Sequence, residues 1–137
     1  MLEVVVDHLG EVQFEATARG HKVFCDQPVE NGGFDEGMTP PELLLASLGT
    51  CAGYYAVQYL KARHLPMRGL RIRTTADKVE APPRLDNIHI ELEYPEALDE
   101  RQRAGVLAAV HKCLIHNTLL YPPKITVDVR VPLPVAA

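Results

Sequence analysis

A chain of 137 residues with 47% apolar and 23% charged residues has the size and composition of one globular domain, which excludes disordered, collagen-like and low-complexity proteins. The net charge of −4, from 14 basic and 18 acidic residues, leaves no basic stripe for binding a nucleic-acid backbone. The three cysteines are too few for a disulfide framework, and the first residues lack the pattern of a signal peptide. We expect a single domain over residues 1–137 that is cytoplasmic, has reduced thiols and binds no nucleic acid.

One apolar segment has to be compared with a membrane-spanning helix. Residues 43–60 contain no charge over eighteen positions, which reaches the length of a span. The same segment carries two glycines and several polar side chains, and the rest of the chain consists of short amphipathic pieces. The pattern therefore favours a buried helix of a soluble fold, without a membrane partner.

The N-terminal part of the chain has the pattern of strands. Short β-rich runs cover residues 2–7, 11–18 and 22–26, and glycines separate them. This predicts a three-stranded antiparallel meander. The following residues 27–38 are rich in glycine and have no periodicity, which predicts a surface loop.

The first helix begins with a recognisable cap. In Thr39-Pro40-Pro41-Glu42 the Thr39 hydroxyl can accept from the amide of Glu42, and the Glu42 carboxylate can accept from the amide of Thr39. The helix should end at residue 63 or 64, because Pro66 disfavours helix in the residue before it.

The second half of the chain completes an α+β order. Residues 70–79 and 87–94 read as two strands, residues 98–119 as a second helix, and the alternating apolar residues 125–131 as a last strand. The predicted order is β-β-β-α-β-β-α-β.

The first helix is apolar on all sides, so one small sheet cannot cover it. A second copy of the chain that shares the core is the simplest cover, and a monomer with long covering loops is the alternative. We expect a homodimer.

Two cysteines fall at positions that a packed interior would bring together. Cys51 lies mid-helix between Gly49 and Gly53, which lower helix stability and suggest a close approach of backbone or substrate. Cys113 lies on the apolar stripe of the predicted second helix, so an oxidised Cys51 could form a disulfide with it. Two unrelated core cysteines are the alternative. Cys25 is given no role.

The chain resembles a known family in this region. The run Met38-Thr39-Pro40-Pro41-Glu42-Leu43-Leu44-Leu45-Ala46-Ser47-Leu48-Gly49-Thr50-Cys51 and the later Lys112-Cys113-Leu114 are similar to the OsmC/Ohr proteins, osmotically induced protein C and organic hydroperoxide resistance protein. The resemblance implies an OsmC-like fold, with two central helices of an intertwined homodimer wrapped by antiparallel sheets. It also implies a peroxidase of organic hydroperoxides, with Cys51 as the peroxidatic and Cys113 as the resolving thiol. The resemblance implies no bound cofactor, but it implies an external dithiol reductant, either of the lipoyl type or a small dithiol.

The resemblance suggests two further catalytic residues. Arg19 corresponds to a turn arginine that would lower the pKa of Cys51, although Arg63, Arg68 and Arg71 also remain candidates. Glu42 matches a glutamate that pairs with that arginine. Glu42 precedes Cys51 by nine residues, which turn an ideal helix by about 900° and place the two side chains on opposite sides. This favours a capping role for Glu42. Leu114 replaces the family's proline, which places the chain near a divergent OsmC-like branch.

Two other function classes fit parts of the pattern. A cysteine hydrolase would use Cys51 with a histidine base, and His111, His116 and Asn117 follow on the second helix. Ideal helix geometry turns His116 toward Cys113 and His111 away, which is poor for a metal site. A binding module without catalysis would hold a small apolar ligand near Tyr54 and Tyr55.

Overall fold

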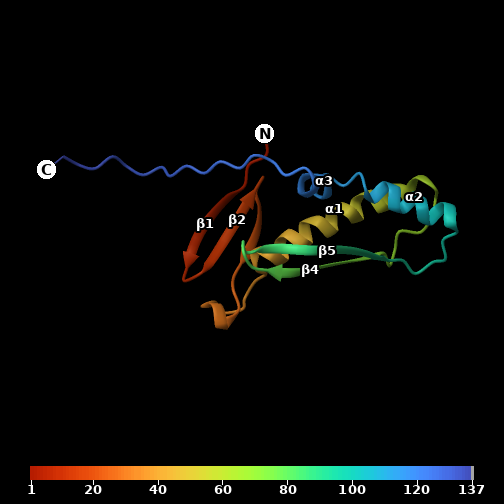
Figure 1. The fold of residues 1–137 in the computed structure, drawn as a ribbon, viewed down its shortest axis with the longest axis horizontal. Helices are drawn as coiled ribbons and strands as arrows, with labels where there is room; N and C mark the ends of the chain where they lie inside the picture. Colours follow the sequence, from red (N-terminus) through yellow and green to blue (C-terminus); the bar gives the residue numbers. More distant parts are fainter. Residues whose placement is uncertain (137) are drawn as a thin grey trace.

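The computed structural model describes residues 1–136 and shows an α+β fold (Figure 1). The N-terminal strands form an antiparallel sheet in the order β1-β2-β3. The tight β2–β3 turn places Arg19 in the left-handed region, with φ of 52°. The predicted meander is confirmed, and its strands are β1 (Val5–Gly10), β2 (Gln13–Ala18) and β3 (His21–Cys25).

A completely buried carboxylate, that of Asp26, organises the loop that follows β3. It accepts hydrogen bonds from the Gln13 side chain at 3.0 Å and from the amides of Gln27, Phe34 and Glu36 at 2.7 to 3.1 Å. Burial alone would raise the pKa of Asp26, but these bonds outweigh burial and lower it to about 2. The loop, which includes the short 3-10 helix η1 (Val29–Asn31), is therefore tied to the sheet by an ionised side chain.

The long helix α1 (Pro40–Ala62) begins and ends as predicted. Thr39 is its N-cap, and the reciprocal hydrogen bonds with Glu42 form the capping box. At the other end His64 is left-handed, and the amides of His64 and Leu65 donate to the carbonyls of Lys61 and Leu60. This Schellman arrangement satisfies the last carbonyls before Pro66.

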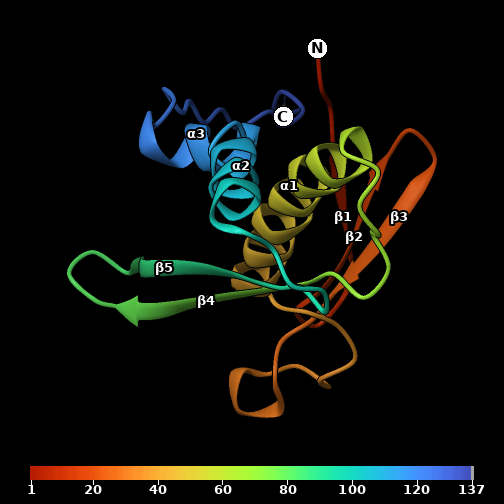
Figure 2. The ribbon, with the colours of Figure 1, turned by 90° about the vertical axis from the view of Figure 1, so that its right-hand side faces the viewer.

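A hairpin and a second helix pack against α1. Strands β4 (Arg71–Val79) and β5 (Arg84–Glu93) form an antiparallel pair. Figure 2 shows α1 between this hairpin and the N-terminal sheet, with α2 (Glu100–Val110) beside its later turns. The core lies where these elements meet and consists of Ala52, Ala56, Leu60, Val106 and Val110.

The prediction of one helix over residues 98–119 is wrong in its middle. The helix ends at Val110, and a separate helix α3 (Leu114–Leu120) follows. Cys113 has extended backbone angles, φ −54° and ψ 123°, and its sulfur accepts from the amide of His116 at 3.4 Å. Capping by a buried side chain thus interrupts the helix, which a search for apolar periodicity does not detect.

The predicted last strand has no partner strand in the chain as described. Residues 122–136 form no strand, and Figure 1 shows them running away from the body of the molecule. The alternating Ile125, Val127 and Val129 are at least 81% exposed. An extended segment needs the free edge of another strand to form a ladder, and here none pairs with it.

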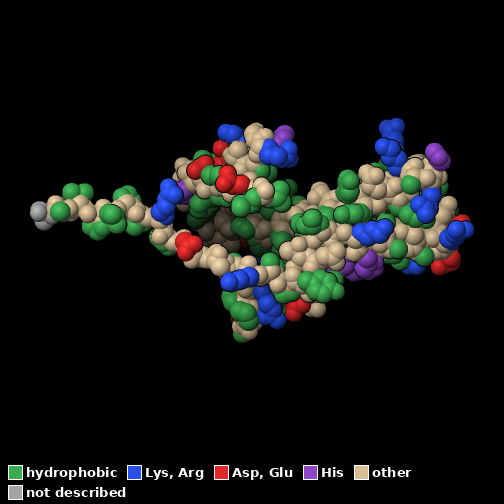
Figure 3. All heavy atoms as spheres, turned by 90° about the horizontal axis from the view of Figure 1, so that it is seen from above, with side chains coloured by type: hydrophobic (Ala, Val, Ile, Leu, Met, Phe, Trp, Pro, Cys, Tyr) green, Lys and Arg blue, Asp and Glu red, His purple; other side chains and the backbone are tan. Residues whose placement is uncertain are grey.

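Apolar side chains also remain uncovered on the rest of the molecule. Figure 3 shows hydrophobic side chains around a hollow next to the N-terminal sheet. Large exposed residues of the N-terminal sheet include Val5, Val6 and Val23. Within residues 1–136, none of the helices combines the length and the hydropathy needed to cross a bilayer.

Candidate functional site

Cys51 and Cys113 meet where α3 packs against α1. Cys51 lies near the middle of α1 and is partly exposed, whereas Cys113 precedes α3 and is completely buried. The two thiols lie close enough for each to shift the pKa of the other, and neither is in a disulfide. The structure therefore brings together the two sulfur atoms that the sequence places far apart.

The surroundings make the two thiols unequal. Burial tends to raise the pKa of Cys51, but the hydrogen bond from Cys113 and the amides of Ile115 and Leu114 lower it below its ordinary value. Burial raises the pKa of Cys113, and its hydrogen bond to Cys51 raises it further, against a smaller opposite effect of the His116 amide. Cys51 is thus the thiol that ionises first, and Cys113 is the donor that stabilises it.

The backbone at the start of α3 supplies the stabilisation of the Cys51 thiolate that was expected from an arginine. The first amides of a helix have no acceptor within the helix. Here the amides of Leu114 and Ile115 act on the sulfur of Cys51. A pattern of side-chain types does not indicate which backbone amides act as donors. The only signal in the sequence was the helix break before Leu114, and the apolar periodicity of this segment predicted a continuous helix instead.

Arg19 is not brought to Cys51 within the chain. It lies exposed in the β2–β3 turn. Neither Arg19 nor any other guanidinium is among the groups that shift the pKa of Cys51 in the described residues. Of the other candidates, Arg63 lies over the ring of Tyr59, with 4.0 Å from its guanidinium carbon to the ring centre.

Glu42 is also distant from Cys51. Helix α1 is continuous through Gly49, so the nine residues from Glu42 to Cys51 span about 13.5 Å along the axis and end on the opposite side. The carboxylate instead accepts from the hydroxyl of Thr39 at 2.6 Å and from its amide at 3.1 Å. The hydroxyl bond, more than the amide bond, lowers the pKa of Glu42.

The small residues around Cys51 are explained by a neighbouring strand. A Cβ on Gly49 would lie 2.9 Å from Oγ1 of Thr74, and one on Gly53 would lie 3.4 Å from Cγ1 of Ile72. The Thr74 hydroxyl donates to the carbonyl of Leu45 at 3.1 Å. The close approach inferred from these glycines is therefore that of β4.

A cavity of about 310 Å³ lies one helical turn from Cys51. It is mostly apolar, and the ring of His116 is part of its wall. The Nδ1 atom of His116 is buried and has no hydrogen-bond partner within residues 1–136. The lining residues are Leu48, Leu85, Asp86, Asn87, Ile88, Ile90, His116, Leu119 and Leu120.

The histidines differ from their predicted arrangement. Because the helix is broken at Cys113, the rings of His111 and His116 face each other with centres 5.7 Å apart, so the prediction that His111 turns away is wrong. No cluster of three or more metal-binding side chains occurs in the part of the chain that the structure describes. Tyr54 and Tyr55 contact edge to face at 5.2 Å, and Tyr54 is 60% exposed.

Comparison with solved structures finds the same fold. An osmotic stress induced and detoxification response protein, so described, from Psychrobacter arcticus has a TM-score of 0.79 at 21% identity, covering 86% of this chain and 88% of its own. An OsmC-like protein from Mycoplasma pneumoniae has a TM-score of 0.70 at 20% identity, covering 88% and 87%. A protein from Legionella pneumophila, described as an organic hydroperoxide resistance protein OsmC, has a TM-score of 0.60 at 17% identity, covering 85% and 88%.

The family comparison covers most of the chain, including both cysteines of the site. A search of curated proteins gave no match. The family model described as OsmC-like protein matches residues 33–128, which is more than half of the 137 residues. The chain belongs to the OsmC family.

Proposed function

We propose that the protein is a thiol peroxidase that reduces organic hydroperoxides through Cys51, with Cys113 as the resolving thiol. The observation that carries the proposal is the pair of neighbouring thiols in which the pKa of Cys51 is lowered and that of Cys113 is raised. A thiolate is the form of cysteine that attacks a peroxide. Family membership supports the same chemistry, since a structural neighbour is described as a hydroperoxide resistance protein.

The first step oxidises Cys51. Its thiolate attacks the distal oxygen of the hydroperoxide, the O–O bond breaks, and the alkoxide leaves and is protonated to the alcohol. Cys51 becomes a sulfenic acid. The partial exposure of Cys51 lets a peroxide reach the sulfur, while the amides of Leu114 and Ile115 hold the negative charge there beforehand.

The second step closes a disulfide. The thiol of Cys113 loses its proton and attacks the sulfur of Cys51, and the hydroxyl leaves as water. Because α3 packs against α1 and the two thiols are close enough to shift each other's pKa, we expect resolution to require little movement of α3 relative to α1. An external dithiol then reduces the disulfide in two exchange steps and becomes oxidised itself, so that no bound cofactor takes part.

We further propose that the working form is a homodimer. The exposed alternating segment at residues 125–131 and the uncovered side chains of the N-terminal sheet support this, because a second copy would bury both. Within one chain Arg19 does not act on Cys51, so any role of Arg19 at the thiol pair depends on that second copy.

The experiment is oxidation of the reduced protein by cumene hydroperoxide, followed by mass spectrometry of the intact chain and its peptides. We expect one Cys51–Cys113 disulfide per chain and one alcohol per peroxide consumed. The Cys113→Ser variant should accumulate Cys51 sulfenic acid, trapped by dimedone, and Cys51→Ser should not react. Cys25→Ser is the matched control and should behave as the unmodified chain. Thiols that stay reduced under excess hydroperoxide would overturn the proposal.

A further inference from the structure

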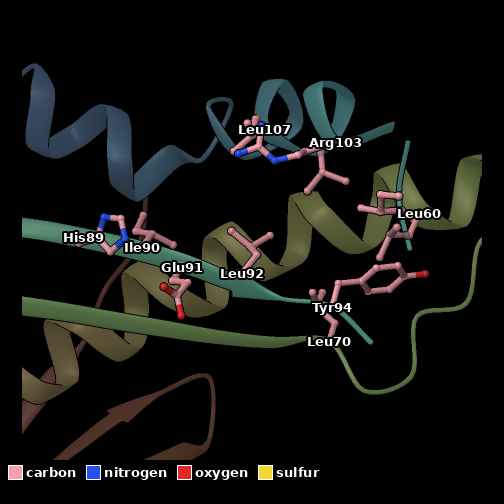
Figure 4. Close-up of a pocket in the computed structure, with 11 residues that line it drawn as sticks. Leu60, Leu70, His89, Ile90, Glu91, Leu92, Tyr94, Arg103 and Leu107 are labelled. Carbon is pink, nitrogen blue, oxygen red and sulfur yellow. The ribbon is translucent and has the colours of Figure 1, made fainter. Parts of the chain in front are cut away.

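A second pocket lies at the far end of α1 from the thiol pair. It has a volume of about 310 Å³ and is enclosed by α1, β5, α2 and the β5–α2 connection (Figure 4). Leu60, which marks its α1 wall, follows Cys51 by nine residues, or about 13.5 Å along the helix. We call this cavity the α2 pocket, lined mainly by Leu60, Leu92, Tyr94, Leu98, Arg103 and Leu107.

The interior of the α2 pocket is apolar. Figure 4 shows Ile90 and Leu92 pointing from β5 toward the two helices. The hydroxyl of Tyr94 donates to the carbonyl of Pro66 at 2.6 Å, so the polar end of this side chain is already satisfied by the protein. A cavity of this size with an apolar interior suits the hydrocarbon part of one small ligand.

One cation stands at the rim of the α2 pocket. Figure 4 shows the side chain of Arg103 extending along α2 toward Leu107, above the apolar wall. In the part of the chain that the structure describes, the guanidinium has neither an ion pair nor a hydrogen bond. His89 and Glu91 of β5 also line the pocket, and Figure 4 shows the carboxylate of Glu91 on the opposite side of β5 from Leu92.

We propose that the α2 pocket binds a small amphipathic carboxylate, whose hydrocarbon chain fills the cavity and whose carboxylate pairs with Arg103. A guanidinium with free donors binds a carboxylate in a two-pronged geometry. An alcohol of the same length would gain only the apolar contacts, and an alkylammonium would be repelled. This site is separate from the thiol pair and does not depend on the peroxidase proposal.

The test measures binding of decanoate by calorimetry, with 1-decanol and decyltrimethylammonium as matched probes, each below its micelle concentration. We expect decanoate to bind at least fivefold more tightly than decanol and decyltrimethylammonium to bind least. Arg103→Gln should weaken decanoate about tenfold and leave decanol unchanged, since a hydrogen bond to a charged group contributes about that factor. Arg101→Gln is the matched control, because this exposed residue lies on the same helix outside the pocket.

A second measurement locates the ligand. In methyl NMR of the Cys51→Ser chain, decanoate should shift the methyl resonances of Leu92 and Leu98. Leu107 lies at the rim and is 41% exposed. The substitution Leu107→Trp should block the rim and abolish those shifts. The cavity near Cys51 shares Ile90 with the α2 pocket, so shifts confined to Leu48 and Leu119 would place the ligand there and overturn the proposal. Equal affinity for decanoate and decanol, the same loss in both arginine variants, or no binding of decanoate would also overturn it.

Discussion

The thiols of Cys51 and Cys113 shift each other's pKa in opposite directions, lower for Cys51 and higher for Cys113, and this makes the pair asymmetric. Cys113 keeps its proton because it is buried and next to a developing negative charge. Cys51 loses its proton more readily because a thiol and two amides point at it. Two residues of the same type therefore differ in how readily they ionise.

This asymmetry predicts how the thiols react with iodoacetamide. The lowered pKa of Cys51 means that its alkylation rate, followed over a pH series by peptide mass spectrometry, should rise at lower pH than the rate of an ordinary cysteine, whose pKa is about 8.5. Cys113 should be alkylated only at higher pH. Replacing Cys113 by Ala removes the donor and should move the Cys51 profile to higher pH. Cys25→Ser should leave it unchanged; a Cys51 profile that does not respond to Cys113→Ala would contradict the assigned donor.

Local signals made the first half of the fold predictable. The capping box of Thr39 and Glu42 and the turn before Pro66 fix both ends of α1 within two residues of their predicted places. These signals depend on neighbouring residues in the chain, and so a sequence displays them directly. The presence of both cysteines at one site was predictable because each lies in an apolar segment that packs inward, although Cys113 is not on a helix as expected.

The second half depends on contacts that a pattern does not contain. Cys113 leaves the helix because its sulfur caps α3 in a buried setting, and this break also turns His111 toward His116. Ideal helix geometry places both rings wrongly. The amides that act on Cys51 likewise become visible only when distant segments are brought together. In the first half of the chain, the same holds for the buried Asp26.

Variants of the α1 cap can distinguish a structural role of Glu42 from a catalytic one. Thr39→Ala should lower the free energy of unfolding by about 1 kcal/mol, measured by urea denaturation, because one helix amide loses its acceptor. Glu42→Gln keeps an acceptor and should change stability little. In both variants the rate of Cys51 oxidation by cumene hydroperoxide should stay within twofold of the unmodified chain. A large loss of rate in Glu42→Gln without a loss of stability would assign Glu42 to the chemistry.

Replacing each of the two glycines that flank Cys51 by alanine should change the free energy of unfolding in opposite directions. A Cβ at position 49 meets Thr74 Oγ1 at 2.9 Å and disturbs its bond to Leu45, so Gly49→Ala should destabilise by about 1 kcal/mol net despite better helix propensity. At position 53 the new Cβ contacts Ile72 at 3.4 Å, and Gly53→Ala should stabilise by about 0.5 kcal/mol. Urea unfolding of both variants checks the pair. Stabilisation by Gly49→Ala would show that β4 does not approach as described.

Asp26 makes the glycine-rich loop sensitive to acid. Its pKa in the folded chain is lowered to about 2. Its contribution to stability is therefore fully present at a pH above the ordinary pKa of a carboxyl group, and it is lost as the pH falls toward about 2. Asp26→Asn should speed hydrogen exchange at the amides of Phe34 and Glu36, because an amide side chain cannot accept all their bonds. Asp35→Asn, at an exposed neighbouring position, is the control. Equal exchange in both variants would contradict the role of Asp26.

The alternating segment at residues 125–131 should decide the oligomeric state. Val127 and Val129 are each 85% exposed, and burying such a side chain contributes about 1.5 kcal/mol. If a second copy covers this face, Val127→Lys with Val129→Lys should convert a dimer to a monomer in sedimentation velocity. Asp128→Lys changes the other face of the same extended segment and should leave the dimer intact. A monomeric unmodified chain would overturn the homodimer, and a dimer that survives both substitutions would place its interface on another surface, such as the uncovered N-terminal sheet.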